Sequence, residues 1–181
     1  MKDKLLKQAE RQYNPKQRVM ALLVEGVFFL GVLPIVIARL SSALDRWFHL
    51  SSFADGAVNI VVGGLLIIGG FVFALWAIYV QFTIGKGTPV PLMATQKLII
   101  QKPYNYCRNP MTLGTIVLYL GFAILLGSLS AVGLVLLGTT FLLVYITHIE
   151  EKEMEWRFGE EYREYRRQTP FLIPRLWHRG G

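Results

Sequence analysis

The sequence predicts an all-α, multi-pass membrane protein with about four transmembrane helices and a C-terminal cytosolic amphipathic helix. Hydrophobic residues make up 53% of the 181 positions and charged residues only 17%, and the mean hydropathy is +0.42. A soluble domain usually carries about a quarter charged residues. Apolar runs of about 20 residues recur along the chain, and a helix of that length crosses the roughly 30 Å hydrocarbon core. The single cysteine, Cys107, excludes a disulfide scaffold.

The expected spans cover about residues 19–40, 57–82, 111–127 and 130–148. Only Ser128 and Leu129 separate the last two, so we expect these to form an antiparallel helical hairpin. A cleavable signal peptide is the alternative for the first span. Its apolar stretch exceeds the 7–15 residues of such signals, however, and 18 mostly polar residues precede it. Residues 1–148 are expected to form a transmembrane domain, and residues 149–181 a cytosolic helix and tail.

Basic residues are confined almost entirely to alternate connections. Seventeen of the 19 Lys and Arg residues lie before the first span, between the second and third, or after the fourth, while Arg39 and Arg46 flank the other side. The positive-inside rule therefore places both termini and the 83–110 loop in the cytosol, at the inner membrane if the source is bacterial. The net charge of +7 then reflects topology and attraction to anionic lipid. No nucleic-acid partner is expected, because no base-reading module accompanies the charge.

Glu25 lies inside the first expected span. A carboxylate there costs roughly 2.5–3.5 kcal/mol on insertion scales, which makes it a candidate functional residue. It lies only six or seven residues from the cytosolic end of the span, so snorkelling toward the interface is the alternative.

Two motifs occupy the expected cytosolic loop. GKGTP (85–89) follows the second span, and its glycines either end a helix in a turn or let the backbone approach a ligand. In KPYNYCRNPMTLG (102–114), Asn109 and Pro110 are a helix-start signal. The free amides and dipole of that helix favour an anion beside Arg108. The alternative is that Arg108 snorkels to a lipid phosphate.

A third cluster follows the fourth span. Met154, Phe158, Tyr162 and Tyr165 are spaced by 4, 4 and 3 residues and so form one stripe of an amphipathic helix. On a helical wheel, Glu151 falls within this stripe and Glu150 at its edge. Glu153 and Arg157 are expected to form an exposed i,i+4 pair. The alternatives are that Glu151 pairs with a nearby arginine, or that Gly159 breaks the helix.

Together these motifs resemble the integral-membrane methyltransferases of the isoprenylcysteine carboxyl methyltransferase and phospholipid methyltransferase group. RNPMTLG (108–114) resembles the family's Arg-His/Asn-Pro-x-Tyr-x-Gly motif, and the cluster from Glu150 to Pro170 its C-terminal motif. The resemblance covers residues 60–175. This chain departs from the pattern, because Asn109 replaces the usual His and Thr112 the usual Tyr. A histidine general base therefore cannot be carried over to position 109, since an amide does not titrate.

The resemblance implies a site for S-adenosylmethionine (SAM), formed by the cytosolic loop, the start of the hairpin and the C-terminal helix. Its cofactor-binding candidates are Gly85, Gly87, Tyr104, Tyr106, Arg108, Asn109, Pro110, Gly114, Glu150 and Glu151. Arg108 would hold the SAM carboxylate, and the two glutamates its ammonium or ribose hydroxyls. The candidates for accepting a substrate proton are Glu150, Glu151 and His148. No metal site is proposed, and Cys107 without a base partner is not expected to be a nucleophile.

The implied activity is SAM-dependent methylation of a lipid or lipophilic acceptor that enters from the bilayer. Phospholipid amine N-methylation is preferred because of the GxG motif and the four-span layout. Carboxyl O-methylation of a prenylcysteine-like or other lipophilic acid is the alternative, and a thiol acceptor is a further one. A non-catalytic membrane scaffold, or a related NADPH-dependent membrane reductase, would be a different class of protein.

Overall fold

The computed structural model describes residues 13–53, 56–88 and 93–174. Its elements follow in the order α2 (Pro15–Val27), η1 (Phe28–Val32), α3 (Leu33–Trp47), α4 (Ala57–Val80), η2 (Gln81–Gly85), α5 (Pro110–Leu125), α6 (Leu129–Tyr145), η3 (Ile146–Glu150) and α7 (Glu151–Gln168), where η marks a short π-helical segment. Every regular element in these three ranges is a helix, so the all-α class expected from the sequence is confirmed.

Three helical stretches are long and apolar enough to cross a membrane, namely Pro15–Trp47, Ala57–Gly85 and Leu129–Gln168, the last of which is kinked at Gly159. The fourth apolar helix, α5, has 16 residues. At 1.5 Å per residue it is about 24 Å long, which is shorter than the roughly 30 Å of hydrocarbon. These apolar helices are those of a multi-pass membrane protein. The division expected at residue 148 falls inside a continuous helix, because η3 joins α6 to α7.

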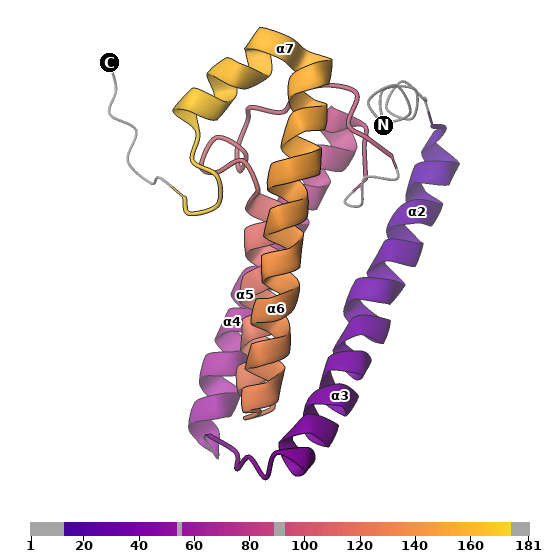
Figure 1. Ribbon diagram of the computed structural model, residues 1–181. Coiled ribbons are helices and arrows are strands. Elements are labelled where there is room, and N and C mark those ends of the chain that lie inside the picture. Colours follow the sequence, from indigo (N-terminus) through magenta and orange to yellow (C-terminus); the bar gives the residue numbers. More distant parts are fainter. Residues whose placement is uncertain (1–12, 54–55, 89–92, 175–181) are drawn as a thin grey trace.

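The segments that carry the basic residues share one end of the bundle. Figure 1 shows α7, the loop before α5 and the N-terminal end of α2 at this end, which we call the α7 end. The α3–α4 connection and the α5–α6 turn lie at the opposite end. This arrangement agrees with the one-sided charge pattern of the sequence. That the α7 end faces the cytosol stays a prediction.

Helices α4 and α5 pack with their backbones in close contact. A Cβ on Gly70 would lie 2.6 Å from the carbonyl oxygen of Gly114, and one on Gly114 would lie 2.7 Å from that of Gly70. Gly63 and Gly121 have the same reciprocal relation, at 2.8 Å in both directions. Small residues allow this close approach of membrane helices, where packing contributes most of the association energy. The absence of side chains at these glycines therefore allows α5 to pack directly against the backbone of α4.

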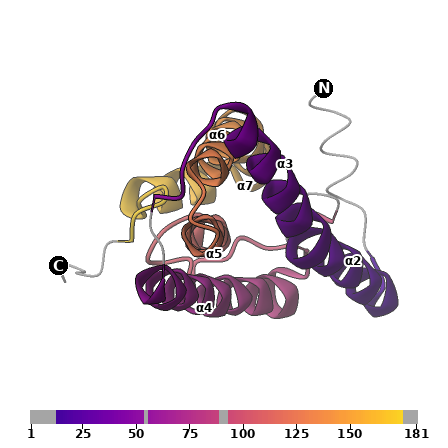
Figure 2. The ribbon, with the colours of Figure 1, turned by 90° about the horizontal axis from the view of Figure 1, so that it is seen from below.

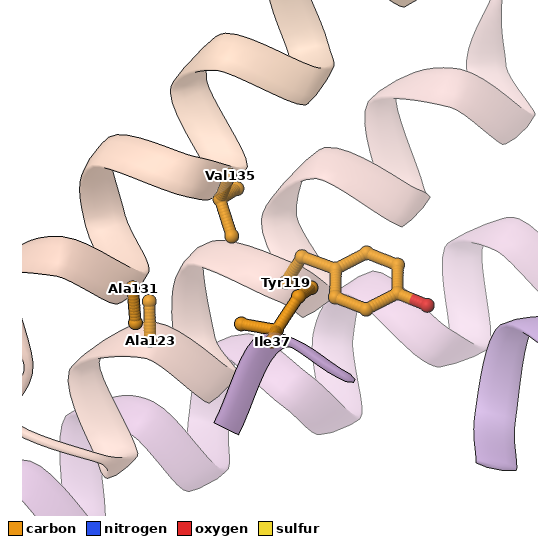
Figure 3. Close-up of a cluster of buried hydrophobic side chains, with 5 residues drawn as sticks. All are labelled: Ile37, Tyr119, Ala123, Ala131 and Val135. Carbon is orange, nitrogen blue, oxygen red and sulfur yellow. The ribbon is translucent and has the colours of Figure 1, made fainter. Parts of the chain in front are cut away.

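A cluster of buried side chains joins the other helices (Figure 3). Its members are Ile37 of α3, Tyr119 and Ala123 of α5, and Ala131 and Val135 of α6. Figure 2 shows α5 lying between α4 and α6, while the α2–α3 helix runs diagonally from beside α6 toward α4. The helix α3 is thus fixed to α5 and α6 away from the α7 end.

The end of α3 is tied to the α5–α6 turn by a carboxylate. Asp45 accepts hydrogen bonds from the Ser128 hydroxyl at 2.5 Å and from the Ser130 amide at 3.2 Å. The helix continues to Trp47, beyond the residue 40 at which the first span was expected to end. The first part of the connection expected between the first two spans is thus helical.

The π-helical segment η1 marks the change from α2 to α3 and has an identifiable cause. The amide of Leu33 bonds to the carbonyl of Phe28, five residues earlier, rather than to that of Phe29. Pro34 has no N–H to offer the freed carbonyl. The Tyr119 hydroxyl donates to the Phe29 carbonyl instead. This bond fixes the rotation of the α2–α3 helix against α5.

Candidate functional site

One cavity of about 550 Å³ lies between α2, α4, α5, the α6–α7 helix and the loop before α5. We call it the central cavity. Phe29, Phe71 and Leu118 contribute to its apolar walls. Its charged lining residues are Glu25, Arg108, Glu150 and Glu151. A volume of this size is typical of small-molecule sites, in which a few polar groups orient a ligand within apolar walls.

Arg108 and Glu151, which are 43 residues apart in the sequence, form a buried ion pair in the cavity wall. The Glu151 Oε1 atom accepts from Nη2 of Arg108 at 2.6 Å and from Nε at 3.0 Å. The side chains are 10% and 6% exposed, respectively. Arg166 approaches the other oxygen, Oε2, at 3.6 Å. The structure therefore brings the two expected charged residues together, as direct partners of each other.

Arg108 also holds the segment that follows α7. Its Nη1 atom donates to the carbonyl oxygens of Arg166 at 3.0 Å and Thr169 at 2.8 Å. Its own amide donates to the carbonyl of Pro170 at 2.8 Å. A guanidinium has five N–H groups, and contacts with described residues occupy four of them, so that one on Nη2 has no partner in this part of the chain. Arg108 thus acts mainly as an internal anchor in this structure.

Asn109 contributes to the same anchor. Its side-chain amide donates to the carbonyl of Phe171 at 3.0 Å and does not cap α5, although the helix begins at Pro110 as the sequence predicts. The side-chain cap expected at this position is therefore wrong, because the amide bonds the segment after α7. Both Asn109 and Pro110 line the central cavity.

Glu150 is the carboxylate near the Arg108–Glu151 pair that has no partner among the described residues and can therefore bind a ligand. Within the described ranges it has neither a hydrogen bond nor an ion pair, and it lines the cavity one residue before Glu151. Glu153, in the same turn, is paired with Arg157 at 3.2 Å. The sequence led us to expect that pair on an exposed face. That expectation is wrong, because Arg157 also donates to the carbonyl of Thr95 and so buries the pair beneath the loop.

A chain of hydrogen bonds positions Tyr104 at the cavity. Its hydroxyl donates to Oε1 of Gln81 at 3.0 Å, and its carbonyl accepts from the Tyr165 hydroxyl at 2.7 Å. Gln81 in turn donates to the carbonyl of Thr88 at 2.8 Å. Burial, with a smaller contribution from the nearby Glu150 charge, raises the pKa of Tyr104, so its hydroxyl remains a hydrogen-bond donor.

The two glycines of the GxG motif are needed for packing within the loop. A Cβ on Gly85 would lie 2.7 Å from Cδ1 of Ile99, and one on Gly87 would lie 2.9 Å from the carbonyl oxygen of Met93. The Thr88 amide donates to that same Met93 carbonyl at 3.0 Å. Neither glycine lines the central cavity. Their role here is to let residues 85–88 fold against residues 93–99.

Three further candidates lie away from the cavity lining. The Tyr106 ring packs edge-on against Trp76, with centroids 6.3 Å apart. Gly114 is part of the α4–α5 contact. His148 is exposed, and its Nδ1 atom lies 3.0 Å from the carbonyl oxygen of Val144. The structure therefore groups Tyr104, Arg108, Asn109, Pro110, Glu150 and Glu151 at one cavity, without these three or the GxG glycines.

Cys107 is fully buried beside this group. Burial raises the pKa of its thiol to about 11, so the side chain stays protonated near neutrality. A protonated thiol is a poor nucleophile. This agrees with the sequence-based expectation that Cys107 packs and does not react.

Sequence reasoning missed several lining residues. Gln81 was not among the candidates, yet it lines the cavity and links Tyr104 to the GxG loop. Thr112, which replaces a family tyrosine, and Tyr119 also line it. Their common signal is a polar side chain within an otherwise apolar helix.

Comparisons with known proteins identify the family. A model of the phospholipid methyltransferase family matches residues 58–161, which is more than half of the chain. A methanethiol S-methyltransferase of Crocosphaera subtropica is 29% identical over 140 residues, which cover 77% of this chain and 51% of that protein. The chain thus spans about half the length of the curated relative it matches. By the family match, the chain belongs to the phospholipid methyltransferase family.

Proposed function

We propose, from this family membership and from the central cavity, that the protein transfers a methyl group from SAM to a lipophilic acceptor. A phospholipid amine is the acceptor class we favour. The observation that carries the proposal is the pairing pattern at the α7 end. Arg108 neutralises Glu151, while Glu150 lines the same cavity with neither a hydrogen bond nor an ion pair to any described residue.

The residues present fit a cationic methyl donor. SAM carries an ammonium and a sulfonium against a single carboxylate, so it requires negative partners away from water. Glu150 offers one, and the aromatic side chain of Tyr104 lines the same cavity. The last free N–H of Arg108 and the polar side chain of Gln81 add contacts for the carboxylate and the ribose. When bound, SAM would supply an electrophilic methyl group.

The chain's own residues would align the reactants and exclude water. The Arg108–Glu151 pair lines the cavity and holds the segment after α7 through the Thr169 carbonyl. The apolar walls, which include Phe29 and Leu118, accept the acyl part of an acceptor. Such alignment can lower a displacement barrier by roughly 7–11 kcal/mol, so no covalent protein nucleophile is needed. Glu150 and Glu151 remain the proposed proton acceptors at this end. His148 is not proposed for that role, because its side chain lies outside the cavity.

A thiol acceptor is the second candidate, because the curated relative is named a methanethiol S-methyltransferase. A thiol would use the same donor site and the same apolar walls. The carboxylic-acid acceptor is less well supported, because Arg108, the arginine among the described lining residues, is already paired with Glu151.

Two measurements test the proposal on the full chain in detergent. Isothermal titration with SAM should show saturable binding that Glu150→Gln weakens about tenfold and that Glu164→Gln, an exposed position of α7, leaves unchanged. Transfer of labelled methyl groups should then mark phosphatidylethanolamine in preference to an alkyl thiol or a prenylcysteine acid. Absence of SAM binding, or of label in every acceptor, would support the non-catalytic scaffold instead.

A further inference from the structure

Helix α2 forms a wall of the central cavity that is one helix thick. Its inner face lines the cavity through Leu22, Glu25 and Gly26, and Phe29 continues this face in η1. Glu25 is buried, so its side chain is turned inward and the snorkelling alternative of the sequence is wrong. The opposite face of the helix is exposed and apolar, with Met20, Leu23, Val24 and Val27. Because Pro15–Trp47 is long and apolar enough to cross a membrane, this helix separates the cavity from the bilayer.

This wall is the part of the cavity that packs least against the rest of the bundle. Among the described helices, close packing joins α4 to α5, α3 to α6 and α5 to α6, whereas α2 packs closely against η1 alone, into which it continues. The helix α3 is fixed by Ile37 in the buried cluster and by Asp45 at the α5–α6 turn. Figures 1 and 2 show that α3 lies beside α6, while α2 diverges from it toward the α7 end. The helix α2 can therefore move as a rod while α3 stays in place.

The segment η1 has the features of a hinge between α2 and α3. Helices bend at prolines and at π-helical turns, and η1 is a π-helical turn followed directly by Leu33 and Pro34. A Cβ on Gly31 within it would meet no described atom within 4 Å, so this segment has room to change conformation. The Tyr119 hydroxyl donates to the Phe29 carbonyl at this level and so anchors the pivot to α5. Hinges are often a few residues at the ends of elements that absorb a change in backbone angles.

Arg18 holds the N-terminal part of α2 against η2. Its guanidinium donates to the Phe82 carbonyl, and its central carbon lies 4.1 Å from the centre of the Phe82 ring. Arg18 precedes Phe29 by eleven residues, or about 16 Å along a helix. A bend of about 20° at η1 would move Arg18 by about 6 Å. This movement exceeds the roughly 3.5–4.0 Å contact distance between carbon atoms, so it opens a passage wide enough for an acyl chain.

The acceptor of the proposed reaction needs a route of this kind. Its acyl chains stay in hydrocarbon, because exposing apolar surface to water is unfavourable, so it reaches the cavity between spanning helices. The backbones at Gly70 and Gly114 close the α4–α5 contact, and the buried cluster fills the contact of α3, α5 and α6. The cavity instead has α2 on one side and Leu142 and Ile146 of the α6–η3 helix on another. Among the described helices, movement of α2 is thus the opening that disrupts the least packing.

We propose that α2 is a hinged gate of the central cavity, which swings about η1 to admit a lipid acceptor from the bilayer, and that Arg18 latches this gate to η2. The inference rests on the proposed methyl transfer and adds the route by which the acceptor enters. Neither Arg18 nor Phe82 is among the described lining residues, so the latch is separate from the residues proposed to bind SAM. Closure of the gate behind the acceptor keeps water from the reacting groups.

A distance measurement on the full chain tests the gate without any turnover. Pairs of spin labels on introduced cysteines, in a Cys107→Ala background and in nanodiscs of phosphatidylcholine, report helix separations by pulsed electron resonance. The gate pair is Met20→Cys on α2 with Tyr79→Cys on α4, and the reference pair is Ile35→Cys on α3 with Phe141→Cys on α6; all four positions are exposed. Arg18→Ala should add a population displaced by about 6 Å to the gate pair and leave the reference pair unchanged.

Lys16 provides the matched control, because it is an exposed cation of the same helix. Lys16→Ala should leave the gate-pair distances as they are in the labelled chain with Arg18 intact. Three results would overturn the gate: identical gate-pair distances with and without Arg18, equal shifts of the gate and reference pairs, or the same shift in Lys16→Ala as in Arg18→Ala.

Methyl transfer gives the second test and separates the two proposals. In Arg18→Cys with Phe82→Cys, again in the Cys107→Ala background, a short bis-methanethiosulfonate reagent bridges the latch, and dithiothreitol removes the bridge. The bridge should lower transfer to phosphatidylethanolamine about tenfold and keep the Kd for SAM within twofold, and reduction should restore transfer. Equal transfer by bridged and reduced chains would refute the gate and leave methyl transfer standing. Absence of transfer in every chain would refute the proposed function and the acceptor route that rests on it, while the label distances still decide whether α2 moves.

Discussion

Replacement of Arg108 by alanine tests whether this residue is the main anchor of the α7 end. The substitution removes the ion pair with Glu151, whose side chain is 6% exposed, and the donors to the Arg166 and Thr169 carbonyls. Breaking a buried pair by removing one partner costs about 3–5 kcal/mol, because the other charge stays buried. Arg166 lies 3.6 Å from Glu151 and can take over part of the contact, so we expect the lower end of this range.

Cys107 supplies the assay, because it is fully buried and adjacent to Arg108. A thiol-reactive fluorescent reagent labels it only when the contact between α7 and the loop opens. When opening is fast and reversible, the labelling rate follows the population of the open form. A loss of about 3 kcal/mol corresponds to an increase of roughly 100-fold, since about 1.4 kcal/mol is a factor of ten.

Two further variants make the test specific. Arg163→Ala breaks exposed ion pairs of the same helix and should leave the labelling rate nearly unchanged. The double variant Arg108→Met with Glu151→Leu should recover much of the lost protection, because replacing both members of a buried pair removes the uncompensated charge. If Arg108→Ala labels as slowly as the original chain, or if Arg163→Ala labels equally fast, Arg108 is not the anchor we describe.

Three shorter predictions concern other parts of the molecule. Gly114→Ala should lower the free energy of unfolding by about 1–3 kcal/mol, measured by thermal unfolding, because the added Cβ would overlap the α4 backbone. The control Gly133→Ala places its Cβ in open space and should not lower the free energy of unfolding. Alkylation of Cys107 in the folded chain should still accelerate between pH 10 and pH 11, because burial raises the pKa of its thiol to about 11. The unfolded chain should approach its plateau by about pH 10, since the pKa of a free thiol is about 8.5; coincident profiles would refute the raised pKa. Gln81→Leu should weaken SAM binding about tenfold by titration calorimetry, since Tyr104 loses the acceptor that orients it; an unchanged affinity would show that this bond does not serve the site.

The contact between Arg108 and Glu151 shows which features of the site a sequence pattern can predict. The stripe on α7 placed Glu151 on the buried face, and the motif around Arg108 placed that residue at a helix start, so their convergence was predictable. That Glu151 pairs with an arginine was one of the alternatives that the sequence left open, but its partner could not be named from the pattern. The further contacts of Arg108 could not be predicted either, because they depend on the chain after Gly159. The backbone there has φ 55° and ψ −125°, which turns the last part of α7 back over the loop and brings the Arg166 and Thr169 carbonyls onto Arg108.

The two glycines of the GxG motif show a case in which the sequence pattern did not reveal the structural role. A GxG motif indicates backbone freedom, which fitted either a helix end followed by a turn or a ligand contact, and the family resemblance implied the ligand contact. In the structure, Ile99 and Met93 lie so close to Gly85 and Gly87 that a Cβ atom at either glycine would overlap its neighbour. Those neighbours lie within the same loop, and no periodicity reveals how a loop folds on itself. Burial of Glu153 under Thr95 was missed for the same reason.

The amino-acid order by itself determined the properties that depend on neighbouring residues: the helical class, the apolar lengths suited to a bilayer, and the clustering of positive charge on alternate connections. Only the tertiary structure decided which charges are neutralised. Glu150 and Glu151 are neighbours in the sequence, yet Glu151 is paired with an arginine 43 positions away, while Glu150 lines the same cavity with no hydrogen bond or ion pair to a described residue. The reason is physical: electrostatic energy depends on distance in space and on burial, and both are set by how the helices pack.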